Sequence, residues 1–150
     1  MQLRTQSKSK HPFERPMATT GLARSLDQVR VLIVDEDMRS SASLRSMLLG
    51  LGYESTRVAY SGKRALVLAS EFSPTVVLLD LELPDMSGYH LAHMMRSHAD
   101  AHVRRLRLIA LAGSGAYASG ELAQAAGFHG CLTKPVRRFA LNGLLRALRH

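Results

Sequence analysis

The sequence predicts one α/β domain built on an open, doubly wound parallel sheet. From Arg30 onward, short apolar runs alternate with longer stretches of helical period, and the strongest runs are almost continuously apolar. Strands that helices cover on both faces have this composition, and parallel strands need a crossover between them. At 150 residues the chain is long enough for one such domain and too short for two ordinary ones.

Five strands are expected. Three of the candidates are nearly continuous in apolar residues, which is typical of central strands. Two weaker and more polar segments, 53–59 and 128–132, suit the edges of the sheet. In chain order the expected strands are 31–34, 53–59, 76–79, 108–111 and 128–132.

Five helices are expected between and after these strands, each with apolar side chains at helical spacing. Ser61 and Ser87 are placed to cap two of them, and Gly50 ends another. Strict alternation with right-handed crossovers gives a flavodoxin-like sheet, which binds ligands beyond the carboxyl ends of its strands. The expected helices are 38–49, those that begin after Ser61 and after Ser87, 119–126 and 137–148.

The first residues of the chain have a different composition. Residues 1–28 are rich in Ser, Thr, Lys and Arg, include Pro12 and Pro16, and show no sustained apolar period. We therefore expect a disordered basic extension over 1–28 and a folded domain over 29–150. A transit peptide would share the basic composition, but the prolines and Glu14 interrupt any amphipathic helix.

The formal net charge of +8 raises the possibility of a nucleic-acid partner. Five Lys and Arg lie in the first 29 residues, and the others are scattered without interleaved aromatic residues, so a solvated surface is favoured. No apolar run approaches the ~20 residues that cross a bilayer. The single cysteine, Cys131, cannot form an intrachain disulfide. We expect a cytoplasmic protein without a membrane or nucleic-acid partner.

Acidic residues follow two of the expected strands directly. Asp35 and Glu36 come after the first strand and Asp80 after the third, and Lys134 follows the fifth. If these strand ends are neighbours, their carboxylates converge and favour a hard divalent cation such as Mg²⁺. A metal and a lysine together neutralise an incoming phosphoryl group and let a carboxylate act as nucleophile. The site therefore suits an aspartyl phosphate.

Three stretches, VLIVDED, VVLLDLELPDMSG and GCLTKPV, resemble in order and spacing the signature stretches of receiver domains from two-component response regulators and hybrid histidine kinases. The resemblance covers roughly residues 29–149. It implies the CheY-like strand order 2-1-3-4-5, with Asp80 as the phosphorylation site and Lys134 in contact with the phosphoryl group. It also implies a cis peptide before Pro135, and a Mg²⁺ site formed by Asp35, Glu36, Asp80 and the backbone carbonyl of Glu82.

The resemblance also implies a role in signalling. A sensor histidine kinase or a histidine phosphotransfer protein would donate the phosphoryl group in a phosphorelay. The domain would be a phosphoprotein and no enzyme in the ordinary sense, although it would assist its own Mg²⁺-dependent phosphorylation and dephosphorylation. The face formed by helices 119–126 and 137–148 could support a homodimer. A stand-alone regulator and the terminal receiver of a hybrid kinase would look alike at this level.

Structural roles compete with these assignments. Acidic residues after strands often cap the following helix, and Asp37 or Glu36 could do this without a metal. Many family members carry Asp at the position of Glu36, whose longer side chain could alter the metal geometry. A lysine such as Lys134 is usually solvated surface. For Asp80, Glu36 and Lys134 the shared strand-end position favours the functional role.

Two positions depart from the family pattern. Ala112 stands where members carry Thr or Ser, with the nearest hydroxyl at Ser114, and Cys131 replaces an aromatic residue. Ala112 has no donor and Cys131 no ring, so we expect a phosphoryl relay or sink, or a receiver with an altered switch. The alternative is a degenerate receiver that binds partners regardless of phosphorylation. As a side chain, Cys131 is expected to be a small core residue.

Overall fold

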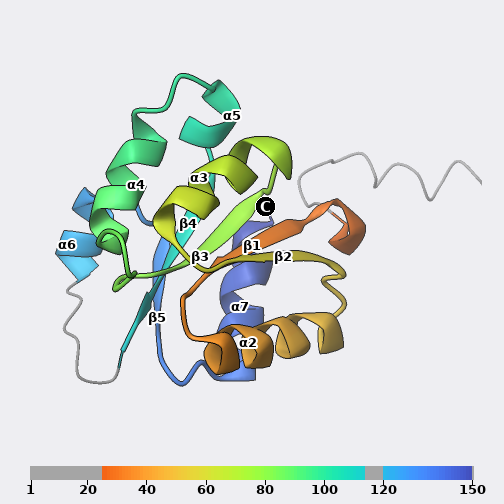
Figure 1. Ribbon diagram of the computed structural model, residues 1–150. Coiled ribbons are helices and arrows are strands. Elements are labelled where there is room, and N and C mark those ends of the chain that lie inside the picture. The colour runs from red at the N-terminus through yellow and green to blue at the C-terminus, as the bar shows by residue number, and fades with distance from the viewer. Residues whose placement is uncertain (1–24, 114–119, 150) are drawn as a thin grey trace, which may run out of the picture.

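A computed structural model describes residues 25–113 and 120–149 of the chain. Five parallel strands form one sheet in the order β2-β1-β3-β4-β5 (Figure 1). The expected flavodoxin-like sheet is confirmed. Its two edge strands are β2, which lies within 53–59, and β5, which overlaps 128–132 and ends one residue later. The strands are β1 (Arg30–Val34), β2 (Ser55–Ala59), β3 (Val76–Asp80), β4 (Arg107–Ala112) and β5 (Gly130–Thr133).

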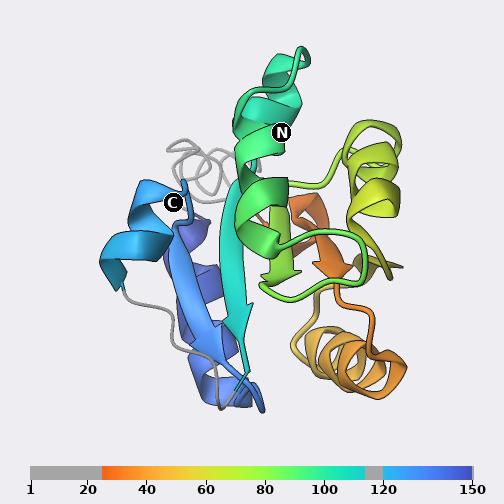
Figure 2. The ribbon, with the colours of Figure 1, turned by 60° about the vertical axis from the view of Figure 1, so that its left-hand side comes forward.

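Helices cover both faces of this sheet (Figure 2). On one side lie α2 (Met38–Gly50) and α7 (Arg138–Leu148). On the other side lie α3 (Gly62–Glu71), α4 (Gly88–Arg96), α5 (Ala101–Arg104) and α6 (Gly120–Ala125).

The described residues contain one α-helix more than the five expected. The additional helix, α5, is only four residues long, which is too short for a helical period to reveal it. Its cap is Asp100, whose side chain accepts the backbone N–H of His102 at 2.8 Å. A 3₁₀ turn, η2 (Leu26–Gln28), also precedes β1, so ordered structure begins before residue 29. The remainder of the expected extension, residues 1–24, lies outside the described residues.

The core has two layers, one on each face of the sheet. Alternate side chains of a strand enter opposite layers: Leu32 and Val34 of β1 pack under α3 and α4, whereas Val31 and Ile33 pack under α2 and α7. All four are fully buried. Burying one such side chain stabilises the fold by roughly 1.5–3 kcal/mol, so the central strands form a rigid support for their carboxyl ends.

Helix caps fix where the chain leaves those ends. Ser61 accepts the N–H of Arg64 at 3.2 Å and Ser87 that of His90 at 3.1 Å, as the sequence predicts. Asp37 caps α2 and accepts two backbone N–H groups of its first turn. The capping alternative is therefore correct for Asp37.

In the part of the chain that the structure describes, none of the helices has the length and apolar character needed to span a membrane.

Candidate functional site

Three side chains from separate parts of the chain meet at the carboxyl edge of the sheet. The Lys134 ammonium donates to Oδ2 of Asp35 at 2.8 Å and to Oδ2 of Asp80 at 3.1 Å. The side chain of Asp35 is fully buried, and those of Asp80 and Lys134 are 12% and 22% exposed. Strand order explains the convergence, because β3 lies beside β1 and both run in the same direction.

Backbone N–H groups hold the other oxygen of each carboxylate. Oδ1 of Asp35 accepts the N–H of Asp37 at 3.0 Å, and Oδ1 of Asp80 accepts the N–H of Glu82 at 3.0 Å. Each carboxylate therefore faces its own loop with one oxygen and the shared ammonium with the other. These bonds restrict rotation of both side chains and leave the Oδ2 atoms directed at Lys134.

The main chain positions Lys134 at the end of β5. Its backbone N–H donates to the carbonyl oxygen of Ala112, the last residue of β4, at 2.7 Å. The peptide bond that follows, between Lys134 and Pro135, is cis. Lys134 is thus anchored through its backbone to β4, while its side chain bridges Asp35, which follows β1, and Asp80, which ends β3.

Charge and burial oppose each other at Asp80 and Lys134. Burial raises the pKa of the Asp80 carboxyl, and the Glu82 N–H and the Lys134 ammonium lower it by less. Burial lowers the pKa of Lys134, but its bonds to Asp35 and Asp80 outweigh this effect and leave that pKa raised. Lys134 is therefore fully charged at neutral pH and offsets part of the repulsion between the two carboxylates.

The carboxylate oxygens at this site are ligands of the type that a hard cation prefers. Mg²⁺ binds one or two carboxylates and keeps several waters, and Asp35 and Asp80 offer two carboxylates from neighbouring strands. No three His, Cys, Asp or Glu side chains lie together in a metal-binding arrangement within the described ranges. Glu36 is exposed. The metal roles of Glu36 and of the Glu82 carbonyl remain predictions.

The loop between β3 and α4 is held by a residue that sequence patterns did not single out. The two carboxylate oxygens of Asp85 accept the backbone N–H groups of Gly62 and Lys63, at 2.8 and 3.0 Å. These bonds lower the pKa of Asp85. The partners lie more than twenty residues upstream at the start of α3, so no local spacing could reveal the contact.

A close backbone approach explains the glycine that begins α4. A Cβ on Gly88 would lie 2.5 Å from the carbonyl oxygen of Asp80 and 2.7 Å from Cα of Leu81. The Gly88 N–H also donates to the Leu81 carbonyl at 2.8 Å. Only a residue without a side chain allows α4 to start this close to the end of β3.

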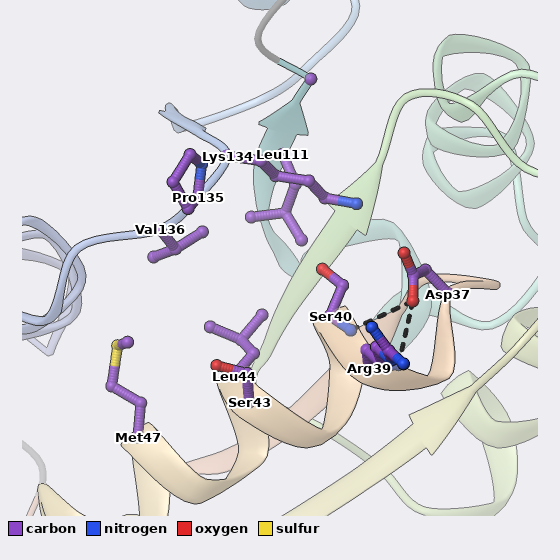
Figure 3. Close-up of a pocket in the computed structure, with 11 residues that line it drawn as sticks. Asp37, Arg39, Ser40, Ser43, Leu44, Met47, Leu111, Lys134, Pro135 and Val136 are labelled. Carbon is purple, nitrogen blue, oxygen red and sulfur yellow. Dashed lines mark hydrogen bonds between the residues drawn. The ribbon is translucent and has the colours of Figure 1, made fainter.

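A hollow of about 530 Å³ lies beside Lys134, between the start of α2 and the segment after β5 (Figure 3). Its wall combines apolar side chains with the hydroxyls of α2. The lining residues are Asp37, Arg39, Ser40, Ser43, Leu44, Met47, Leu111, Gly113, Lys134, Pro135 and Val136.

The two atypical positions have different environments. Ala112 is 4% exposed at the end of β4 and offers only a methyl group. Cys131 is exposed, so its expected place in the core is wrong. The reason is that β5 is an edge strand in which Leu132 faces the core and Cys131 the other way. Ser114, the nearest hydroxyl to Ala112, lies outside the described residues.

Comparisons with known proteins agree with this architecture. The family model for the response regulator receiver domain matches residues 31–146. The chain is 39% identical over 133 residues to the virulence sensor protein BvgS of Bordetella pertussis, covering 85% of this chain and 11% of that protein. It is 32% identical over 122 residues to the sensor histidine kinase AtsR of Burkholderia thailandensis, covering 81% and 20%. The chain thus spans a fifth or less of these two relatives.

A shorter relative and two solved structures match over most of their own length. The polar-differentiation response regulator DivK of Brucella ovis is 28% identical over 106 residues, which covers 71% of this chain and 84% of DivK. A CheY-like response regulator receiver domain protein from Methanospirillum hungatei has a TM-score of 0.69 at 27% identity, with 80% and 92% of the two chains covered. A CheY-like receiver domain from Methylobacillus flagellatus has a TM-score of 0.70 at 25% identity, with 80% and 98% covered.

Proposed function

We propose, from the premise that this chain belongs to the response regulator receiver domain family, that Asp80 accepts a phosphoryl group from a phosphohistidine donor. The family is one of signalling domains in two-component systems and not of ordinary enzymes. One observation carries the proposal: a single ammonium, that of Lys134, bonds to two buried carboxylates at the carboxyl edge of the sheet.

The chemistry is a transfer of one phosphoryl group. A carboxylate oxygen of Asp80 attacks phosphorus, the new P–O bond forms, and the P–N bond of the phosphohistidine breaks. The imidazole nitrogen leaves with the electron pair and takes up a proton. Burial makes the Asp80 carboxylate more basic than a solvated one, which favours attack. The Lys134 ammonium stabilises the negative charge on the phosphoryl oxygens.

Mg²⁺ is the cofactor we propose for this step. The Asp35 and Asp80 carboxylates would hold it, with Glu36 and the Glu82 carbonyl as further expected ligands. When bound, the ion neutralises charge on the phosphoryl oxygens. Support for the site comes from the carboxylate pair at the ends of β1 and β3.

Intact-mass measurement tests the acceptor. The purified chain is incubated with Mg²⁺ and a small acyl phosphate, and we expect a gain of one phosphoryl group that EDTA prevents. Asp80→Asn should abolish the gain. Asp100→Asn serves as the matched control, because this carboxylate caps α5 at the other end of the molecule. A gain that persists in Asp80→Asn would mean that the acceptor is a different residue.

The donor is proposed from the relatives. BvgS and AtsR are named as sensor proteins, and the chain matches only a part of each. We therefore propose a sensor histidine kinase or a histidine phosphotransfer protein as the donor. Transfer from a phosphorylated phosphotransfer protein should follow the same Asp80 dependence as the small donor.

A second candidate function follows from Ala112 and Cys131. Neither side chain can supply the hydroxyl contact or the ring movement of the family switch. We propose that phosphorylation leaves β4 and β5 close to their resting positions and that the domain acts as a relay or sink. Large amide shifts throughout both strands on phosphorylation would contradict this. No mass gain at all would favour a binding module that works without phosphorylation.

A further inference from the structure

A second polar hollow lies at the end of the molecule opposite the acidic site. It has a volume of about 400 Å³ and lies between the end of α4, α5 and the turn before β5. In Figure 2 these segments include the helices at the top of the view, whereas the strand arrowheads point the other way. The residues that line it are Arg96, Arg104, Arg105, Gly127, Phe128 and His129.

We propose that this hollow is a binding site for a phosphate group. Among the residues that the structure describes, three arginines line it and no carboxylate does. Guanidinium groups match phosphate oxygens in geometry as well as in charge. The proposal is independent of phosphoryl transfer at Asp80, because the two sites share no residue.

The positive charge in the hollow has no counter-charge in the described protein. Throughout residues 25–113 and 120–149, the two ion pairs present both involve Lys134, so the lining arginines are unpaired. Desolvation is clearest at Arg96, because burial lowers the pKa of its guanidinium group and no carboxylate offsets the lost hydration. A desolvated cation without a negatively charged partner is costly, and an anion in the hollow would reduce that cost.

Two of the arginines are already held in place by backbone carbonyl groups. Arg96 donates through Nη1 and Nη2 to the carbonyls of Arg104, Leu106 and Gly127, at 2.6 to 2.8 Å. Arg104 donates through Nη1 to two carbonyls of the preceding loop. These bonds tie the segments together, which is a structural role. They also fix the guanidinium planes, so the arginine side chains would lose little conformational freedom when an anion binds.

Donors remain for a ligand. In the described structure, the side chain of Arg105 makes no hydrogen bond, and Nη2 of Arg104 makes none. His129 accepts the N–H of Leu108 on Nδ1 at 3.2 Å, so in its neutral form the proton sits on Nε2. Burial first, and then the charges of Arg96 and Arg107, lower the pKa of His129 and keep it neutral at pH 7. The Nε2–H of His129 is therefore a neutral hydrogen-bond donor beside the guanidinium groups.

Amide NMR of the full chain, titrated with inorganic phosphate in the absence of Mg²⁺, tests the proposal. Sodium chloride at matched ionic strength controls for screening. We expect saturable shifts confined to the residues around the hollow. Arg105→Gln should weaken phosphate binding by about ten-fold. It removes no bond of the folded protein, so the variant should fold normally. Arg45→Gln on the exposed face of α2 removes the same charge elsewhere and should bind like the wild type.

Further titrations identify the source of the phosphate. Ribose 5-phosphate that binds more tightly than inorganic phosphate would indicate a phosphorylated small molecule, and equal affinity would indicate free phosphate. Shifts that sodium chloride reproduces would overturn the proposal, as would equal affinity of Arg105→Gln and the wild type. A short DNA duplex that shifts these amides with a steep salt dependence, while phosphate does not, would replace the proposal with a polyanion-binding surface.

Discussion

Replacing Lys134 by Met tests the electrostatic centre of the acidic site. Met keeps most of the length of the side chain and removes the ammonium, so Asp35 and Asp80 face each other without a positive partner. Removing one partner of a buried ion pair costs about 3–5 kcal/mol. Because Lys134 keeps 22% of its side chain in solvent, we expect the lower end, about 3 kcal/mol at neutral pH.

The pH dependence of this loss has a definite sign. The raised pKa of Asp80 means that the folded state binds its proton more tightly than the unfolded state. Stability therefore falls as the pH rises from the ordinary carboxyl value of 3.8 through the raised pKa. Without Lys134 that pKa rises further, so the destabilisation should be largest at neutral pH and shrink in acid. Lys134 itself stabilises the wild type until the pH exceeds its raised pKa.

Urea unfolding, followed by circular dichroism in EDTA, measures the effect. Lys63→Met is the matched control, since its side chain is exposed on α3, and it should change stability by less than about 0.5 kcal/mol. Added Mg²⁺ should restore more stability to Lys134→Met than to the wild type, because a cation would replace the missing ammonium. If the variant is as stable as the wild type at neutral pH, the ammonium does not balance the carboxylates.

Three further changes probe the segments that position the site. Gly88→Ala would place a methyl group against the backbone of Asp80 and should lower the free energy of unfolding, measured in urea, by about 1–3 kcal/mol. An unchanged free energy of unfolding would mean that α4 can shift freely. Ser61→Ala removes the cap of α3 and should cost about 1 kcal/mol by the same assay, with an unchanged midpoint counting against the cap. Asp85→Asn can accept only one of its two backbone N–H groups, so it should destabilise the protein at neutral pH. The difference should vanish as the pH falls through the lowered pKa of Asp85, and a difference that persists in acid would exclude the carboxylate as its cause.

The positions of the strands and of the site could be predicted because both depend on local pattern. Apolar runs identify the strands, and a polar residue that directly follows a run must lie at its carboxyl end. Asp35, Asp80 and Lys134 satisfy this rule, and the structure brings them within hydrogen-bond distance. The order of the strands is not a local property. Only the family resemblance implies it, and without that order Asp35 and Asp80 cannot be placed on adjacent strands.

The features that sequence did not reveal depend on contacts between distant segments or on small size. Asp85 and Arg96 bond to backbone groups of other elements, and backbone partners leave no trace in the residue types. Helix α5 is one turn long, although Asp100 before it is a cap signal. The residue type of Cys131 predicts a place in the core, but its position on an edge strand leaves it exposed.

The bond from the Lys134 amide to the Ala112 carbonyl gives this domain a connection that does not depend on side chains. Ala112 has no side-chain hydroxyl, yet its carbonyl oxygen is the acceptor for the residue whose ammonium contacts Asp80. The same residue therefore contacts Asp80 through its side chain and the end of β4 through its backbone. Every amino acid has a carbonyl group, so this tether tolerates any substitution at position 112 that preserves the strand.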